Sequence, residues 1–454
     1  MADGYLGGTP SLSRQTTTQN YVSTLSIHKP EVTEEFVQRY GDQSLTGLLD
    51  AMGAMVPAAA KKVEHWEEDF IHQAIVMGAA LDTTGGVTAA ATLTYGVAAA
   101  NDDPLRKNDI VLFANGDAAI VTAAPSGGSA TIVPLTAWSA ASATHVANGS
   151  TVIITGNAHE EGAGQPAGLT AAPIKYENDM QILKESYQVS GSEMTNIVWF
   201  QVQDPNTGKS GWLWYIKGEA DTYKRFVNYC EMQMLTGVKA TNAANIATAG
   251  QDFQTSEGLL TFIENGGNVQ NYNGLSGFGL TDFDAMVRTL SKNRGAKENS
   301  LYCGTDLSLA IDDSIAAMFA GGGISYGAFN GAEELAVAFG FKSFQRGGYT
   351  FHKKTYDPFS YYGMLGADGY KYNGMGFLVP GDGGLDMKTR ERVPALRVRY
   401  KEAGGYSREM EHWFEGSAGL DVPTSGADEL VCNYRTERCF EGFGANRFML
   451  IKKA

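Results

Sequence analysis

The sequence has 454 residues, of which 43% are hydrophobic and 19% are charged, and its formal net charge is −15. This length predicts two to four domains, and the apolar content is sufficient for real cores. A negative chain lacks the positive field of a general nucleic-acid binder, although it can still carry a local basic patch. The 55 glycines predict many turns, hairpins and close backbone approaches.

The spacing of the cysteines and the lengths of the apolar runs indicate the cellular compartment of the protein. The sequence has four scattered cysteines without a C-x-x-C pair, which are Cys230, Cys303, Cys432 and Cys439. This spacing indicates neither a zinc cluster nor a disulfide framework, and it suits a reducing compartment. The N-terminus has no apolar run typical of a signal peptide, and no stretch approaches the roughly eighteen apolar residues of a membrane span. We expect a protein that is cytosolic or assembled in a cytosol.

The N-terminal third changes character twice. Residues 1–45 are polar and rich in Thr, Ser and Gln, which predicts an extended arm. Small and apolar residues from Leu45 to Ala60 predict a short helix. The composition then changes sharply across residues 83–157, and no Asp, Glu, Lys or Arg occurs from Ala118 through His159.

Short apolar runs in residues 83–157 are separated by hairpin signals. These signals are Asn115-Gly116-Asp117 and Pro125-Ser126-Gly127-Gly128. The pattern predicts a small β-barrel or sandwich inserted into the main chain. Its nearly neutral surface suits contact with a neighbouring copy better than free solvation.

The middle of the chain predicts a long helix at 212–236. Gly208-Lys209-Ser210 before it matches the end of a phosphate-binding loop, but Gln203 replaces the first glycine and Pro205 removes a backbone N–H donor. We interpret that stretch as a surface turn leading into the helix. Apolar residues at alternating four- and three-residue spacing predict one buried stripe, and Gly237 predicts the helix end. The stripe is Ile216, Ala220, Tyr223, Val227, Cys230 and Met234.

The C-terminal half mixes helices and strands. Thr281 and Thr305 are predicted to cap two helices, the second from Asp306 to Phe319. Strands are predicted in "GYTFHKKTY", "MGFLVPG", "PALRVRYKEAG" and "EMEHWFEG". The tail "ELVCNYRTERCFEGFGANRFMLIKK" predicts a long strand or bent hairpin that returns to the core.

The sequence gives only weak signals for catalytic or metal-binding residues. His65 and His72 are seven residues apart with Glu67 and Glu68 between them, but no H-E-x-x-H motif occurs, so a solvated face is the simpler interpretation. His159 with two glutamates lies in a Gly-rich connection, and no G-x-S-x-G elbow occurs. The most enzyme-like cluster is 409–416, which contains His412. We predict no catalytic, cofactor-binding or metal-ligating residue.

Together these segments resemble the major capsid proteins of tailed bacteriophages with the Hong Kong 97 fold. The residues that resemble the returning strand of that family's extended loop are Asn178, Gln181, Val189, Ser190 and Gly191. The long helix and the C-terminal "YRTERCFEGFGANRF" are similar as well. These features resemble a subgroup from large-genome phages, some of them related to crAss-like phages.

The resemblance implies an α+β fold with seven parts. They are an N-terminal arm at 1–45, the outgoing extended loop at 46–82, an inserted β domain at 83–157, the loop return at 158–200, a peripheral domain at 201–279 with its spine helix at 212–236, an axial domain at 280–400, and C-terminal strands at 401–454 that rejoin the peripheral domain.

The resemblance also implies a function. The chain is expected to assemble with itself into pentamers and hexamers, which form an icosahedral head shell around double-stranded phage DNA. No enzymatic activity, cofactor, sequence-specific DNA contact or membrane is implied. The expected partners are portal, scaffolding and decoration proteins, and the expected location is the virion after assembly in the bacterial cytoplasm. No Lys, Asn and Glu triad for covalent cross-linking matches by position.

Two other interpretations stay open. A tail or surface-layer protein with a β domain would form tubes or flat sheets. A cytosolic enzyme with an inserted β domain would use the 409–416 segment or the His65 and His72 pair, and would form a small discrete oligomer.

Overall fold

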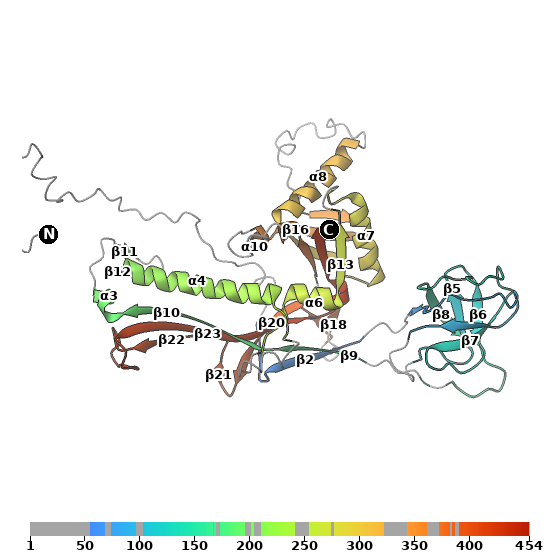
Figure 1. The fold of residues 1–454 in the computed structure, drawn as a ribbon, viewed down its shortest axis with the longest axis horizontal. Helices are drawn as coiled ribbons and strands as arrows, with labels where there is room; N and C mark the ends of the chain where they lie inside the picture. The colour runs from blue at the N-terminus through green and yellow to red at the C-terminus, as the bar shows by residue number, and fades with distance from the viewer. Residues whose placement is uncertain are drawn as a thin grey trace, which may run out of the picture. The chain divides into compact units, whose positions relative to one another are not determined.

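The computed structural model mixes helices and strands, which confirms the α+β class (Figure 1). It describes residues 55–68, 74–96, 103–166, 168, 173–195, 201–203, 210–240, 254–273, 277–321, 343–360, 372–381, 384–385 and 390–453. The predicted arm at 1–45 lies outside these residues. Among them, no helix is long and apolar enough to cross a membrane.

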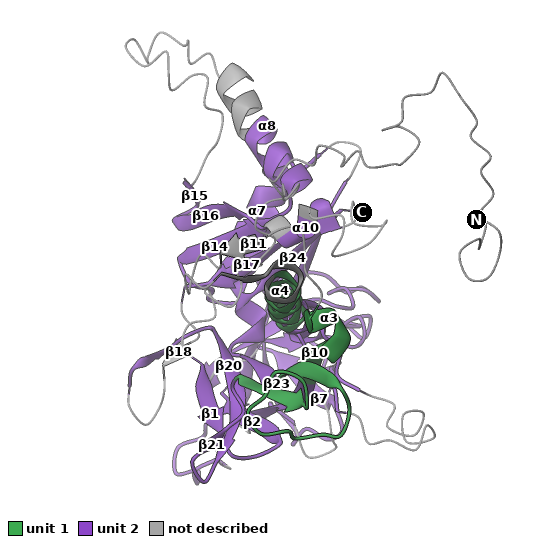
Figure 2. Cartoon of the chain, turned by 90° about the vertical axis from the view of Figure 1, so that its left-hand side faces the viewer, with its two compact units in different colours: residues 1–46, 183–231, 410–435 green, residues 47–182, 232–409, 436–454 purple. Residues whose placement is uncertain are grey.

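The chain forms two compact units, coloured separately in Figure 2. Unit 1 comprises residues 1–46, 183–231 and 410–435, and unit 2 comprises residues 47–182, 232–409 and 436–454. Three elements continue from one unit into the other, which are β10 (Gln181–Ser190), α4 (Leu213–Thr236) and β23 (Glu429–Gly442).

Unit 1 packs helix α4 on a strand hairpin. Its other elements are α3 (Gly191–Thr195), β11 (Gln201–Gln203), β12 (Ser210–Trp212) and β22 (Glu411–Gly416). Strand β22 pairs antiparallel with the first half of β23, from Glu411 opposite Arg435 to Gly416 opposite Leu430. Phe226 of α4 packs over this hairpin with Tyr434, and their rings stack at 5.9 Å.

Helix α4 lies within one residue of its predicted bounds. It begins one residue later than expected and ends at Thr236, where the Gly237 backbone N–H donates a 2.9 Å hydrogen bond to the Gln233 carbonyl. The Gly-Lys-Ser stretch precedes it, but Ser210 begins strand β12 rather than the helix, and residues 204–209 lie outside the described part.

The buried side of α4 differs from the predicted stripe. Cys230 and Met234 are buried as expected, and Val227 is half-buried, but Ala220 and Tyr223 are exposed in the single chain. The side chain of Ile216 lies outside the described part. The buried positions include Thr222 and Phe226 instead. The prediction is wrong at Ala220 and Tyr223. The face of α4 that meets the hairpin is the one that carries Phe226, which the predicted stripe did not include.

The inserted segment is a six-stranded antiparallel barrel. Its strands are β3 (Ile75–Val76), β4 (Ala91–Thr94), β5 (Asp109–Phe113), β6 (Ala118–Val121), β7 (Ser129–Pro134) and β8 (Thr151–Asn157), in the order β3-β8-β5-β6-β7-β4. An antiparallel bridge from Met77 to Tyr95 joins the two edges, so the sheet closes. The core includes Ile75 and Leu81, so the barrel begins before the predicted boundary at 83.

The turns of the barrel follow the hairpin signals. Gly116 has φ +92°, and Gly127 and Gly128 have φ of +57° and +78°. These left-handed conformations favour glycine because it lacks a Cβ atom.

The loop strands of unit 2 flank the barrel in the sequence. Strand β2 (Lys62–Glu67) pairs antiparallel with β9 (Ile174–Asp179), and β1 (Val56–Ala58) pairs parallel with β20 (Leu396–Ala403). The helix predicted for 45–60 is therefore wrong at its end, which is strand. Two further short pairs involve β18 (Gly384–Leu385) with β19 (Arg392–Val393), and β20 with β21 (Tyr406–Ser407).

A second six-stranded sheet carries the C-terminal strand inside it. Its order is β13 (Asn268–Tyr272), β24 (Met449–Lys453), β17 (Gly376–Pro380), β14 (Glu298–Cys303), β16 (Tyr349–Thr355) and β15 (Ser343–Arg346). Its strands contribute to two separate hydrophobic cores, with Phe377 and Leu450 in one and Leu301, Phe351 and Leu378 in the other. Other nearby elements are α6 (Leu259–Gly266), α7 (Leu280–Lys292), α8 (Thr305–Gly321), α10 (Asp357–Ser360) and η2 (Ala445–Arg447).

This sheet does not follow the predicted division at 280–400. Strands β13 and β24 belong to it. Strand β20 instead pairs with β23 in a third sheet, which has the order β1-β20-β23-β10. The helix caps also differ. Gly279 caps α7, and its N–H donates to Asp282 Oδ2 at 2.8 Å, while Thr281 lies within the helix and Thr305 is the first residue of α8.

Candidate functional site

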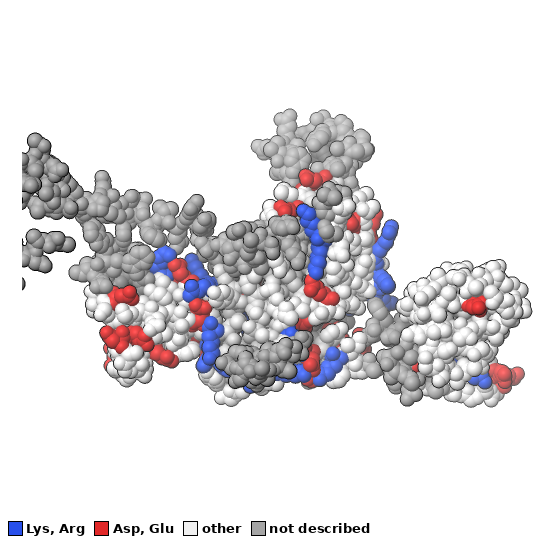
Figure 3. Space-filling model, in the orientation of Figure 1, with Lys and Arg blue, Asp and Glu red and all other residues white. Residues whose placement is uncertain are grey.

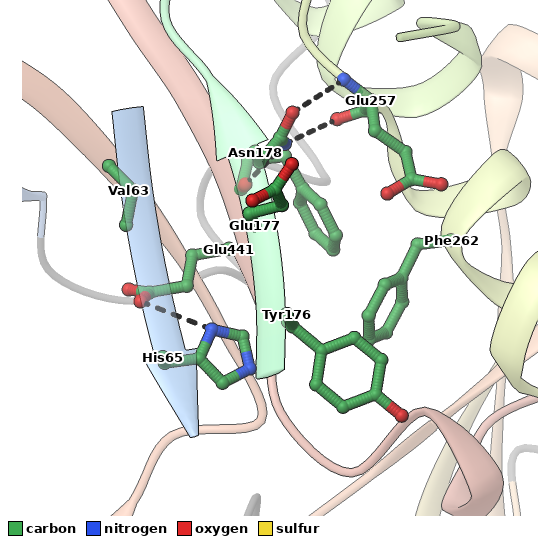
Figure 4. Close-up of a pocket in the computed structure, with 10 residues that line it drawn as sticks. Val63, His65, Tyr176, Glu177, Asn178, Glu257, Phe262 and Glu441 are labelled. Carbon is green, nitrogen blue, oxygen red and sulfur yellow. Dashed lines mark hydrogen bonds and ion pairs between the residues drawn. The ribbon is translucent and has the colours of Figure 1, made fainter. Parts of the chain in front are cut away.

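Asn178 is the centre of a buried polar cluster where the loop strands meet β23 (Figure 4). Its Nδ2 donates to the carbonyl oxygens of Phe440 at 2.7 Å and Glu257 at 3.1 Å. Its Oδ1 accepts from the Glu257 N–H at 2.9 Å. One side chain therefore pairs three backbone groups of two distant segments.

Gln181 and Ser256 complete this arrangement, which we call the Asn178 cluster (Asn178, Gln181, Ser256, Glu257 and Phe440). Gln181 Oε1 accepts from the Ser256 N–H at 3.1 Å, and Ser256 Oγ accepts from the Phe440 N–H at 3.3 Å. Because each polar group has a partner, the cluster can be buried without the cost of an unpaired donor or acceptor. It holds β9 and the start of β10 against β23.

His65 lies beside this cluster, on strand β2. Its Nε2 lies 3.2 Å from Glu67 Oε1 and its Nδ1 lies 3.6 Å from the buried Glu441 Oε1. The ring packs against Tyr176 and Phe443. His72 lies outside the described part. His65 therefore joins two carboxylates in a structural contact.

A cavity of about 30 Å³ opens between His65, Tyr176, Asn178 and Phe262 (Figure 4). That volume holds one or two water molecules. The hydrogen bonds of Asn178 beside it fasten the loop strands to β23.

The outer side of the loop strands carries a network of ion pairs. Lys62 Nζ lies 2.6 Å from Glu177 Oε2, Lys175 Nζ lies 2.8 Å from Glu64 Oε1, and Lys239 Nζ lies 3.2 Å from Glu177 Oε1. The hydrogen bond from Lys62, followed by that from Lys239, lowers the pKa of Glu177 to about 2. The pairing links β2, β9 and the residues after α4.

The other end of the 178–191 stretch is a close backbone approach in unit 1. The Gly191 N–H donates to the Asp428 carbonyl at 3.1 Å, and a Cβ at Gly191 would lie 2.1 Å from Asp428 Oδ1. Val189 is buried, and Ser190 Oγ accepts from the Glu193 N–H at 3.3 Å. The five residues of the resemblance thus have structural roles.

The barrel offers an almost uncharged surface, white in Figure 3 at the right of the view. Val76, Leu135 and Ile153 expose about half of their surface there. Hydrophobic side chains on a surface with few charges suit burial against another protein surface.

His159, another sequence candidate, lies apart from these residues. Its Nδ1 lies 3.2 Å from Asn108 Nδ2.

One grouping was missed by the sequence analysis. His412 of β22 lies near Cys432 of β23 and Glu219 of α4, with ligand atoms within 4.8 Å of one another. No local spacing signals it, since the three residues meet only through the strand register and the helix packing.

Comparison with known proteins gives one family match. The family model described as SU10 major capsid protein matches residues 14–327, more than half of the chain. A search of curated proteins gave no match.

Solved structures are similar at low identity. A chain of Mycobacterium phage Ogopogo has 8% identity and a TM-score of 0.45, with 96% of this chain and 100% of that chain covered. A chain of Gordonia phage Cozz has 8% identity and a TM-score of 0.44, with 98% and 97% covered. A chain from the asymmetric unit of the mature capsid of bacteriophage PhiM1 has 11% identity and a TM-score of 0.34, with 66% and 79% covered.

Proposed function

Since the chain belongs to the SU10 major capsid protein family, we propose that it closes into rings of five and six copies that form an icosahedral phage head shell. The family match carries this conclusion. It assigns the protein a structural role in the virion capsid, and we propose that the chain has no catalytic activity.

The order of elements supports a Hong Kong 97-type division of labour. Residues 1–45 serve as the arm, β2 and β9 as the extended loop that carries the barrel, and α4 as the spine helix. The sheet from β13 to β15 serves as the axial domain, with its boundaries extended to 268–272 and 449–453. The strands around β23 serve as the peripheral domain.

Charge supports the expected relation to DNA. A net charge of −15 does not favour tight adhesion to phosphates, so the shell encloses double-stranded DNA without sequence-specific contacts. Portal, scaffolding and decoration proteins act as partners during assembly in the bacterial cytoplasm.

Electron microscopy of the purified full chain at rising concentration and salt tests the proposal. Closed shells, or rings of five and six copies, are expected. Tubes or flat sheets would favour another structural role. Uniform small particles, also after coexpression with the neighbouring phage structural genes, would contradict shell formation.

A further inference from the structure

Three side chains of metal-ligating type converge in unit 1, each from a different element. His412 Nε2 lies 3.1 Å from Cys432 Sγ and 3.7 Å from Glu219 Oε1, and Cys432 Sγ lies 3.8 Å from Glu219 Oε1. We propose that Glu219, His412 and Cys432 bind one divalent transition-metal ion of the zinc type.

The distances agree with a shared ion. Zinc–ligand bonds of about 2.0–2.3 Å in tetrahedral geometry separate neighbouring ligand atoms by about 3.2–3.7 Å. All three observed separations lie within about 0.1 Å of that range, so small side-chain movements suffice for an ion to sit between the three atoms.

The surrounding rings orient the histidine. In the β22–β23 register, His412 lies opposite Tyr434 and Phe414 lies opposite Cys432, which makes His412 and Cys432 diagonal neighbours. The His412 ring stacks on Tyr434 at 4.8 Å and meets Phe414 edge-on at 4.8 Å. Such packing limits ring rotation, as groups around metal sites commonly do.

The ligand types select the metal. A thiolate, an imidazole and a carboxylate suit zinc or cobalt, whereas magnesium and calcium prefer oxygen ligands alone. A thiolate and a carboxylate together neutralise a divalent cation. The side chains of His412 and Glu219 are 39% and 28% exposed, so water can reach a fourth coordination position.

Binding replaces a proton by the metal. Cysteine binds zinc as the thiolate. On binding, the S–H proton therefore passes to solvent as the sulfur–metal bond forms, which makes affinity rise with pH. The ion would join α4 to the β22–β23 hairpin and stiffen unit 1.

Cobalt titration of the metal-free full chain tests this proposal directly. We expect one cobalt per chain with a thiolate-to-cobalt charge-transfer band, displaced by zinc, and a rise in Tm with zinc. Cys432→Ser should abolish the band, and His412→Gln or Glu219→Gln should weaken binding at least about tenfold. His352→Gln, at an exposed histidine of β16 in unit 2, is the matched control and should bind as the parent does.

Two results would overturn the site. One is the absence of a thiolate band in the parent chain. The other is equal cobalt binding by the parent and His412→Gln, with circular dichroism showing that both are folded. Since His412 is partly exposed, this variant stays informative if Cys432→Ser fails to fold. The test does not depend on shell formation.

Discussion

The side-chain amide of Asn178 donates a 2.7 Å hydrogen bond to the carbonyl of Phe440, 262 residues further along the chain. Asn178→Ala would leave this carbonyl and the Glu257 N–H without their buried partner. We expect a loss of about 3 kcal/mol in the free energy of unfolding, measured by urea denaturation of the unassembled chain. Asn265→Ala removes an exposed amide contact to Glu257 and should cost less than about 0.5 kcal/mol. Equal losses of unfolding free energy in the two variants would show that the buried contacts of Asn178 stabilise the fold no more than an exposed contact does.

Phe226 and Tyr223 test which side of α4 is buried. Phe226→Ala empties a fully buried position and should cost about 3–4 kcal/mol in urea denaturation. Tyr223→Ala removes a ring that is 44% exposed and should cost about 1 kcal/mol or less. If Tyr223 instead meets a neighbouring copy in the shell, its loss will lower the yield of assembled particles. A larger stability loss at Tyr223 than at Phe226 would restore the originally predicted stripe.

The ion pairs of Glu177 predict a dependence of stability on acid pH. Hydrogen bonds from Lys62 and Lys239 lower the pKa of Glu177 from 4.5 to about 2. A carboxyl group whose folded pKa is depressed contributes fully above its unfolded pKa and loses the contribution as pH falls through the folded pKa. The difference in urea midpoint between the parent and Glu177→Gln should therefore shrink from about pH 5 to about pH 2. A difference that is constant across this range would rule out the linkage.

Lys353 joins helix α8 to strand β16 through a largely buried ion pair with Asp312. Lys353→Met leaves the carboxylate without its partner and should cost about 2–3 kcal/mol in unfolding free energy. The double variant Lys353→Met/Asp312→Leu should recover part of that loss. Lys217→Met breaks a more exposed pair with Asp221 on α4 and should cost no more than about 0.5 kcal/mol. Additive effects in the double variant would mean that the pair is not coupled.

We expect the sparsely charged surface of the barrel to tolerate an added charged residue in the free chain but not in the assembled shell. Val76→Glu should leave the urea midpoint nearly unchanged, because Val76 is 55% exposed. It should lower the yield of particles severalfold in sedimentation, since a carboxylate is costly to bury at an interface. Val422→Glu, at a 74% exposed valine of unit 1, is the matched control. Equal yields for the two variants would remove the barrel from the assembly contacts.

Elements defined by local signals were predicted well from sequence. Helix α4 was found from its apolar periodicity and Gly237, and the barrel from the glycine turns at Gly116 and Gly127. Strand β22 was found from its alternation. These signals depend on conformations of a few neighbouring residues, so each can be interpreted without knowledge of the remaining chain.

Contacts between distant residues were not predictable in the same way. Strand β24 was expected to rejoin the peripheral strands, yet it pairs with β13 and β17. A strand pattern specifies a face but not a partner. The convergence of Glu219 and Cys432 on His412 was likewise not predictable, because it depends on both the strand register and the packing of α4. The start of the barrel was missed because β3 has only two residues.

The position of β24 inside its sheet has a consequence for synthesis. Strands β13 and β17 lie on either side of it, and both are translated well before residues 449–453 leave the ribosome. Until then this sheet lacks an interior strand, and its cores lack Met449, Leu450 and Ile451. We therefore expect that a nascent chain does not present a finished surface to its neighbours, and that association waits, until β24 has been translated.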